Sequence, residues 1–462
     1  MDGHELPQSL RAPARRGLTL MTLCLAVLVA QVDTAVVNLG TRPIGEYFGA
    51  SVSALQWVID SYNLVYAVLL LTGGLLADLY GRRRVFMAGA VILTAASAVC
   101  GLAPSVAVLI GGRAIAGLGA AFLLPASLAI IRVVWHDPAE RGRALGIWAA
   151  CNGLALAIGP TLGGLLIHQF GWRSIFLVVI PLCLAALILA IPAIPETSDP
   201  QDRHFDALGQ AFGAVALGGL AFASIQSYTA PKTAVAALII AAFGFLLFIK
   251  IEARKGAVAL VPLDIFRSGD FRGAVTAMAG MTFGMYGALF LLPLDWQSTG
   301  RLNAAAAGLG LMPMALIFVV VSPFSGALAR RFGARLVKAG GVAVIGVGLW
   351  LIGFSADQPS IIPAEFGLAL TGFGMGAATG PLMAAAVGSV AAARSGTASA
   401  LINVARMAGA TIGVAILGAV FAMAHGGPEG LRYSMVVGGL VQIASAAVAW
   451  KATAPAIEPG YR

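Results

Sequence analysis

The chain contains the segment Gly73-Gly74-Leu-Leu-Ala-Asp78-Leu-Tyr-Gly81-Arg82-Arg83-Arg84, which directly follows a long apolar run. Its glycines permit a tight turn and a close approach of neighbouring backbones. Asp78 stands where the apolar run ends, and a carboxylate there can pair with arginine or stabilise a nearby helix N-terminus. We therefore predict that this signature segment is a loop at a membrane boundary. Its acid, Asp78, can stabilise one arrangement of two helical bundles relative to each other.

A second copy of the signature segment lies 252 residues further along the chain, at Gly326-Ala-Leu-Ala-Arg-Arg-Phe-Gly-Ala-Arg335. The two copies share five residues at matching positions: Gly74 and Gly326, Leu76 and Leu328, Ala77 and Ala329, Gly81 and Gly333, and Arg83 and Arg335. Each copy follows the second apolar run of a block of six. Internal repeats of this kind are typical of membrane transporters built from two related bundles.

The composition excludes a soluble protein. Of 462 residues, 59% are hydrophobic and 11% are charged, and the mean hydropathy is +0.91. A soluble domain has about 25% charged residues, so this chain has too few polar side chains to cover a water-facing surface. That argues against a soluble enzyme, a secreted domain and a disordered regulator.

Apolar runs of 18 or more residues are long enough to cross a bilayer as helices. The sequence contains fourteen such runs: 17–40, 55–77, 85–102, 106–131, 143–167, 173–193, 208–227, 232–251, 271–295, 304–329, 335–354, 361–386, 395–422 and 431–450. We therefore predict an all-α integral membrane protein with fourteen transmembrane helices.

The basic residues predict the orientation. With the N-terminus inside, 22 of the 29 lysines and arginines lie in inner segments, 5 in outer loops and 2 within helices. Lysine and arginine collect in cytoplasmic loops, so both termini are predicted to be cytoplasmic. This distribution also accounts for the net charge of +9 without a nucleic-acid partner.

Four ionisable residues fall well inside predicted helices: Asp33, Asp60, Arg113 and Arg406. Such residues are costly in a bilayer and are functional candidates by default. The positions of Asp33, Asp60 and Arg113 along their helices place these three in one depth band. Burial disfavours a charged carboxylate and a nearby arginine favours it. We therefore predict that Asp33 and Asp60 bind protons or cations and that Arg113 adjusts their affinity for protons. Structural hydrogen bonding is the alternative for the two acids, and a contact to backbone carbonyls is the alternative for Arg113.

The signature segment resembles that of the major facilitator superfamily, and other motifs narrow the resemblance to its fourteen-helix drug:proton antiporters. Asp60 in Trp57-Val-Ile-Asp60-Ser-Tyr62 is similar to the second-helix acid of that family. The other matching motifs are Val32-Asp33-Thr34-Ala35-Val36-Val37-Asn38 in the first helix, Arg113-Ala-Ile-Ala-Gly117-Leu-Gly119 in the fourth, Gly153-Leu-Ala-Leu-Ala-Ile-Gly159-Pro160-Thr-Leu-Gly163-Gly164 in the fifth, and Gly396-Thr-Ala-Ser-Ala-Leu-Ile-Asn403-Val-Ala-Arg406 in the thirteenth. The chain departs from the family pattern at Arg330, which stands where the first copy has Asp78, at Val179 and at Asp295.

The resemblance implies two six-helix bundles, 1–200 and 261–462, joined by a two-helix insert and linker at 201–260. It implies a cytoplasmic gate formed by Gly74, Asp78, Gly81, Arg82 and Arg83. It associates the fifth-helix residues Gly159, Pro160, Gly163 and Gly164 with export.

Proline removes an amide donor and clashes with the preceding turn, so we expect Pro160 to break the fifth helix. Gly163 and Gly164 are expected to let a neighbouring helix approach. In the twelfth helix, Gly372, Gly376 and Gly380 form overlapping GxxxG steps, which predict a close-packing face.

The candidates for a substrate cavity are aromatic or polar residues within predicted helices. Aromatic rings can hold a lipophilic cation, although the same rings could simply face lipid or the protein core. Packing or coupling between the bundles is the alternative for Arg406. These candidates are Trp57, Tyr62, Tyr286, Asp295, Asn403 and Arg406.

These features predict a proton-coupled antiporter, not an enzyme, that exports lipophilic cationic drugs or toxic compounds across the bacterial cytoplasmic membrane by alternating access. The sequence has no Walker A segment, so no ATP is expected to drive it, and no cofactor or metal is predicted. The expected partners are the small-molecule substrate, protons and the lipid bilayer, with the chain acting as a monomer. The alternatives are an exporter of one endogenous metabolite and a non-transporting membrane sensor or scaffold.

Overall fold

The computed structural model describes residues 13–198, 206–256, 259, 261–390 and 395–452. Over these residues the chain is helical and contains no strand. The helices are α1 (Pro13–Phe48), α2 (Val52–Tyr80), α3 (Arg82–Gly101), α4 (Val106–Val134), α5 (Pro138–Phe170), α6 (Ser174–Leu177), α7 (Val179–Ala193), α8 (Ala207–Gln226), α9 (Pro231–Lys255), η3 (Leu263–Arg267), α10 (Gly269–Ser298), α11 (Ala304–Gly310), α12 (Met312–Val321), η4 (Ser322–Phe324), α13 (Ser325–Phe332), α14 (Ala334–Phe354), α15 (Ile362–Gly388), α16 (Ser395–Met423) and α17 (Gly427–Ala452).

Each of the fourteen predicted runs lies on helix. Thirteen helical segments of the described chain are long and apolar enough to cross a membrane, and α5, which covers the predicted run 143–167, is a further helix of 33 residues. The tenth run was predicted as one helix, but it divides into α11, α12, η4 and α13. Pro313 is the second residue of α12 and Pro323 lies in η4, and proline cannot donate the backbone hydrogen bond that a continuous helix needs.

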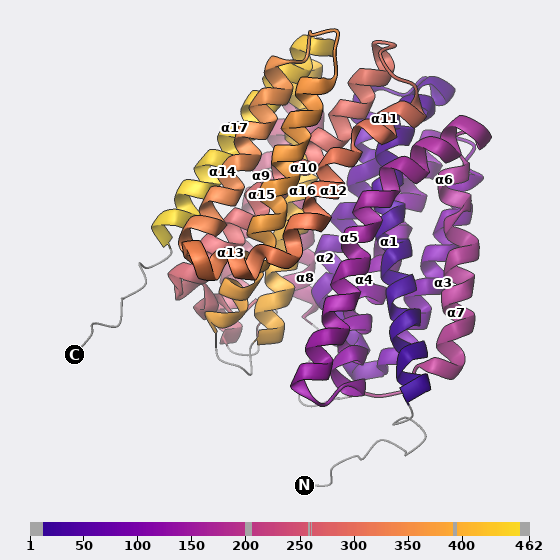
Figure 1. Ribbon diagram of the computed structural model, residues 1–462, viewed down its shortest axis with the longest axis vertical. Coiled ribbons are helices and arrows are strands. Elements are labelled where there is room, and N and C mark those ends of the chain that lie inside the picture. Colours follow the sequence, from indigo (N-terminus) through magenta and orange to yellow (C-terminus); the bar gives the residue numbers. More distant parts are fainter. Residues whose placement is uncertain (1–12, 199–205, 257–258, 260, 391–394, 453–462) are drawn as a thin grey trace. The chain divides into compact units, whose positions relative to one another are not determined.

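The chain divides into two compact units, each with helices running lengthwise side by side (Figure 1). Unit 1 comprises residues 1–210 together with 300–309, and unit 2 comprises 211–299 together with 310–462. In unit 1, the Thr19 hydroxyl near the start of α1 donates to the Ala193 carbonyl at the end of α7, at 2.7 Å. In unit 2, the Arg335 Nε at the start of α14 donates to the Trp450 carbonyl near the end of α17, at 2.8 Å. The start of α1 therefore lies beside the end of α7, and these two helices run antiparallel. Six consecutive membrane crossings require this arrangement of the first and sixth.

The signature segment is helical, which corrects the prediction of a loop. Helix α2 continues to Tyr80 and α3 begins at Arg82, so Gly81 alone separates them. Gly81 has a φ of 107°, and its repeat partner Gly333 has a φ of 86° between α13 and α14. A residue with a Cβ rarely adopts these angles, so one glycine makes the whole turn in each copy.

The glycines at the start of the signature segment differ in what they contact. A Cβ added at Gly73 would overlap the Ala121 carbonyl oxygen on α4 and lie 2.8 Å from the Ala121 carbonyl carbon. A Cβ added at Gly74 would lie 3.6 Å from the Pro125 Cβ, which is an ordinary contact. Gly73 is therefore the residue that lets α2 pack directly against the α4 backbone.

We expect Gly73→Ala to lower the free energy of unfolding by about 1–3 kcal/mol, because the added methyl group forces α2 and α4 apart. The adjacent Gly74→Ala is the matched control and should leave stability unchanged or slightly raised, since alanine favours helix over glycine. Thermal unfolding of the two purified variants measures the difference. Equal stabilities would show that the α2–α4 contact tolerates a side chain.

Helix α5 continues through Pro160, which corrects the expected break. A single proline costs the helix one hydrogen bond, and packing on both sides of it holds the helix together. A Cβ added at Gly159 would lie 2.5 Å from the Ala35 Cβ, and one added at Gly163 would lie 3.0 Å from the Val36 Cβ. The fifth-helix glycines therefore seat α5 closely on α1, as predicted for Gly163.

The segment 300–309 packs on the same part of α5. A Cβ added at Gly164 would lie 3.0 Å from the Ala305 Cα, and one added at Gly308 would lie 3.1 Å from the Pro160 carbonyl carbon. Small residues on both sides thus permit contact between the two backbones, which confirms the close approach predicted at Gly164.

The glycines of the twelfth predicted run form a packing face, as expected. A Cβ added at Gly376 would lie 2.9 Å from the Val321 Cβ, and one added at Gly380 would lie 2.6 Å from the Ser325 hydroxyl oxygen. Gly372 is equally close to the α12 backbone. Helix α15 therefore lies against α12 and the segment that follows it.

The two inserted helices, α8 and α9, pack on each other through small residues. A Cβ added at Gly219 on α8 would lie 3.0 Å from the Ala241 Cβ on α9. Two hydrogen bonds join the start of α8 to α2. The Thr72 hydroxyl donates to the Gln210 side-chain oxygen, and the Gln210 amide donates to the Val68 carbonyl. Neither glutamine bond could be read from the sequence, because residues 72 and 210 belong to separate apolar runs.

Candidate functional site

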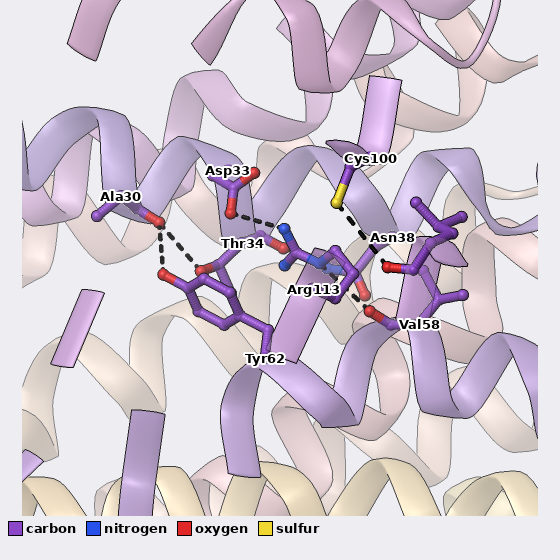
Figure 2. A network of polar contacts seen from close by, with 9 residues as sticks. Ala30, Asp33, Thr34, Asn38, Val58, Tyr62, Cys100 and Arg113 are labelled. Carbon is purple, nitrogen blue, oxygen red and sulfur yellow. Dashed lines mark hydrogen bonds and ion pairs between the residues drawn. The ribbon is translucent and has the colours of Figure 1, made fainter. Parts of the chain in front are cut away.

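A buried ion pair joins Asp33 of α1 to Arg113 of α4. The Arg113 Nη1 lies 2.7 Å from the Asp33 Oδ2, and the two residues are 1% and 0% exposed. The prediction that an arginine lies beside one of the buried acids is therefore correct for Asp33. Figure 2 shows the Arg113 guanidinium between the Asp33 carboxylate and the Val58 carbonyl.

Helix α2 supplies the remaining contacts of Arg113. The Arg113 Nε donates to the Val58 carbonyl at 3.3 Å, and the guanidinium carbon lies 4.5 Å from the centre of the Tyr62 ring. A cation over an aromatic face is stabilised most where water is excluded. The Tyr62 hydroxyl in turn donates to the Ala30 carbonyl of α1 at 3.3 Å. Arg113 thus connects three helices, and it has both the acid partner and the carbonyl contact that the sequence left as alternatives.

Close packing of α4 on α2 makes this geometry possible. A Cβ added at Gly117, one turn after Arg113, would lie 3.1 Å from the Tyr62 carbonyl carbon. The side chain at position 117 must be absent for α4 to approach so closely. The glycine of the fourth-helix motif therefore brings the Arg113 guanidinium within reach of both α1 and α2.

Asp60 lies apart from this ion pair. It is fully buried on α2, and neither of its carboxylate oxygens has a hydrogen-bond partner among the residues that the structure describes. Asn63, one turn further along α2, is also fully buried, and neither its amide nitrogen nor its amide oxygen has such a partner. Residues three apart lie on one face of a helix, so Asp60 and Asn63 form a buried polar pair with unused hydrogen-bonding capacity.

Sequence reasoning missed Asn63. The available signal was a second polar residue at the i+3 position from an acid within an apolar run. It also treated Asp33 and Asp60 as equivalent, whereas the structure gives the arginine to Asp33 alone.

Asp78 pairs with Arg82 within the signature segment. The Arg82 Nη2 lies 2.8 Å from the Asp78 Oδ1, and the Arg82 Nε donates to the same oxygen at 3.1 Å. Both side chains are largely buried. This is one of the pairings that the sequence predicted for Asp78.

The segment after α7 closes over the start of α3. The Arg83 backbone amide donates to the Glu196 Oε1 at 3.2 Å, and the Arg82 amide donates to the Thr197 carbonyl at 2.8 Å. The Glu196 carboxylate also lies 3.7 Å from the Arg84 Nε. Glu196 was not a predicted site residue, although it is the first acid after the sixth apolar run, on the side where the signature segment was placed.

The remaining substrate-cavity candidates are divided between the two units. In unit 1, Trp57 is half-buried and Tyr62 is part of the Arg113 contacts. In unit 2, Tyr286 and Asp295 are buried on α10, and the Asn403 amide donates to the Ser399 carbonyl of its own helix at 2.9 Å. Their role in binding a substrate stays a prediction.

Arg406 is half-buried on α16. Its backbone carbonyl accepts a hydrogen bond from the Thr282 hydroxyl of α10 at 2.7 Å. Its Nε has no hydrogen-bond partner in the described part of the chain. A guanidinium placed in this way can pack helices and can also receive an anionic group.

No group of three histidine, cysteine or acidic residues that could hold a metal ion occurs among the described residues.

The chain is similar to known proteins over most of its length. The model of the Major Facilitator Superfamily matches residues 21–414. The chain is 36% identical over 408 residues to the multidrug resistance protein Stp of Mycobacterium tuberculosis, which covers 88% of this chain and 76% of that protein. It is 31% identical over 440 residues to the methylenomycin A resistance protein of Bacillus subtilis, covering 93% of each chain.

The fold is similar to the crystal structure of a bacterial homologue of the human lysosomal transporter Spinster, in an inward-facing and unoccupied conformation. The TM-score is 0.69 at 18% sequence identity, and the match covers 96% of this chain and 97% of the other. Together with the membrane-spanning helices and the repeated signature segment, these matches place the chain in the major facilitator superfamily of membrane transporters.

Proposed function

We propose that the chain exports lipophilic, cationic compounds from the bacterial cytoplasm across the cytoplasmic membrane in exchange for protons. Relatives named for multidrug and methylenomycin resistance support export of toxic compounds. The chain would act as a monomer and move its substrate without changing a covalent bond.

The observation that carries this proposal is the pair of buried acids in unit 1. An ionised carboxylate buried without a partner costs several kcal/mol, so Asp60 needs either a bound proton or a bound cation to neutralise it. Both ligands would compete for one carboxylate, and the substrate would leave as the proton binds. Asn63 can hold the substrate or a water molecule beside Asp60 through its unused amide.

Asp33 and Arg113 would act together in this cycle. Protonation of Asp33 would release Arg113 from its ion pair and leave the guanidinium held by the Val58 carbonyl and the Tyr62 ring alone. Because Arg113 contacts α1 and α2, such a change alters how these two helices are held against α4.

The signature segment would gate the cytoplasmic end. Asp78 and Arg82 form a partly buried ion pair beside the one-residue turn at Gly81, and Glu196 holds the following amide at Arg83. Opening the gate would exchange these contacts for others. Gly74 would contribute by leaving room beside Pro125. The fifth-helix glycines Gly159, Gly163 and Gly164 carry no side chains, so α5 would be able to shift along its neighbours during the transport cycle.

Transport of ethidium in proteoliposomes of known orientation, with and without an imposed pH gradient, tests the proposal. Wild-type protein should move ethidium against its gradient only when the pH gradient is present. The Asp33→Asn protein that inserts should show no gradient-driven movement, because the asparagine amide can neither bind nor release a proton.

Glu46→Gln is the matched control, since Glu46 lies on the same helix in an exposed pair with Arg42. Its transport should equal that of the wild type. Full gradient-driven transport by Asp33→Asn would remove Asp33 from the mechanism, and a failure of wild-type protein to move ethidium would overturn export of lipophilic cations.

A second candidate is export of one compound that carries a negative charge. The half-buried Arg406 guanidinium, whose Nε has no hydrogen-bond partner in the described chain, favours this alternative. A relative named for resistance to a single antibiotic adds support. A narrow range of transported compounds that does not change in Asp60→Asn would select this candidate over the first.

A further inference from the structure

A cavity of about 350 Å³ lies between the start of α1 and the start of α5, away from the buried acids. Its lining includes Arg16 and Leu20 from α1, Trp135 after α4, and Glu140, Arg143 and Ile147 from α5. All these residues belong to unit 1. The cavity takes no part in the proton or substrate chemistry proposed above.

The cavity lining carries excess positive charge. The Arg16 Nη1 pairs with the Glu140 Oε2 at 2.9 Å, but the buried Arg16 Nε has no hydrogen-bond partner among the described residues. Arg143 is exposed and makes no ion pair with a described residue. Two guanidinium groups therefore face one carboxylate. Asp137 is already engaged as the cap of α5, where it accepts from the Glu140 amide at 2.8 Å.

The charged residues of the lining lie at the membrane boundary. Arg16 is the first residue of the first candidate membrane span, and the distribution of basic residues places this end on the cytoplasmic side. The arginines are therefore at the depth of the phospholipid head groups.

Ile147, which lines the cavity, begins an apolar stripe on α5. Ile147 is 49% exposed, and it is followed by the similarly exposed Leu154, Ile158 and Leu165. These four residues recur at helical spacing and share one face of α5. A large apolar side chain exposed on a membrane-spanning helix contacts acyl chains, so a hydrocarbon path leads directly away from the two arginines.

We propose that this cavity binds an acidic phospholipid of the cytoplasmic leaflet. Its phosphate lies on Arg16 and Arg143, and one acyl chain runs along the stripe that begins at Ile147. Basic pockets between membrane helices on the cytoplasmic side bind the head groups of anionic lipids. Arginine donates charge-assisted hydrogen bonds to phosphate, and Glu140 engages only the Nη1 of Arg16. This inference does not depend on which compound the chain exports.

Native mass spectrometry of the purified full chain, with phosphatidylglycerol or phosphatidylcholine added, tests the site. Wild-type protein should retain one tightly bound phosphatidylglycerol more than the double variant Arg16→Gln/Arg143→Gln. Each basic residue near an anionic lipid surface contributes about fivefold in affinity, so the double variant should bind that lipid on the order of 30-fold more weakly. Binding of phosphatidylcholine should be the same in both proteins.

Arg254→Gln/Arg331→Gln is the matched control, because it removes two exposed arginines from unit 2. This control should bind phosphatidylglycerol as the wild type does. Unfolding temperatures measured without added lipid show whether a variant is itself less stable. Weaker lipid binding can then be distinguished from partial unfolding. Equal binding by Arg16→Gln/Arg143→Gln and wild type would overturn the proposal, as would displacement of the lipid by inorganic phosphate at equal concentration, which would identify a phosphate site instead.

Discussion

Arg113→Ala should destabilise the protein by about 3–5 kcal/mol, because it leaves the Asp33 carboxylate buried without its ion-pair partner. The pair is fully buried, with 2.7 Å between the Arg113 Nη1 and the Asp33 Oδ2. The variant also loses the bond to the Val58 carbonyl and the stacking on Tyr62. Little folded protein should be recovered from membranes, and the remainder should unfold at a markedly lower temperature.

A double-mutant cycle separates the ion pair from the packing. Asp33→Asn/Arg113→Gln removes both charges while keeping side-chain size, so it should be more stable than Arg113→Gln alone. Arg42→Ala, which breaks an exposed pair on α1, is the control and should change stability by less than about 1 kcal/mol. If the double variant is less stable than Arg113→Gln by the full effect of Asp33→Asn, the two residues act independently and the pair does not hold α1 to α4.

Asp60→Asn should abolish export driven by a pH gradient while leaving the protein as stable as the wild type or more so. Asn is the same size as Asp and carries no charge, so it removes the cost of burying an ionisable group that has no hydrogen-bond partner among the described residues. It also removes the only group at that position that can bind and release a proton. The stability and the transport of this variant should therefore change in opposite directions, which is rare for a residue with a purely structural role.

Two measurements on the same purified protein check this prediction. Thermal unfolding gives stability, and ethidium movement into vesicles, with and without a pH gradient, gives coupling. Asp357→Asn is the matched control, since Asp357 is exposed and pairs with Arg432 at 2.9 Å, and it should change neither quantity. Gradient-driven export by Asp60→Asn at the wild-type rate would show that Asp60 is not a coupling group.

Much of the fold was predictable because membrane insertion is encoded locally. A run of about 20 apolar residues has one favourable arrangement in a bilayer, which is a helix that satisfies its own backbone hydrogen bonds. All fourteen runs are helical in the structure, and the repeated glycines at positions 81 and 333 make the same one-residue turn. The prediction failed where local rules compete with packing. Pro160 was expected to break α5, but contacts of Gly159 and Gly163 with α1 keep the helix continuous.

The candidate site was only partly predictable. The rarity of ionisable residues in apolar runs identified Asp33, Asp60 and Arg113 without any structure. Which acid receives the arginine depends on how α1, α2 and α4 are rotated about their axes and how closely they approach. Those quantities depend on contacts such as Gly117 against the Tyr62 carbonyl and Gly73 against the Ala121 carbonyl.

The sequence alone thus predicted the helical runs, their internal repeat, an orientation from charge and the residues that carry unusual polarity, because each of these follows from the free energy of one segment in lipid or water. Only the tertiary structure decided that Asp33 pairs with Arg113, that Asp60 and Asn63 share an unpartnered polar face, that Glu196 holds the signature segment, and that two arginines meet between α1 and α5. Those arrangements join residues that are 3 to 127 positions apart. Apart from the pair on α2, they depend on contacts between helices, which no single segment encodes.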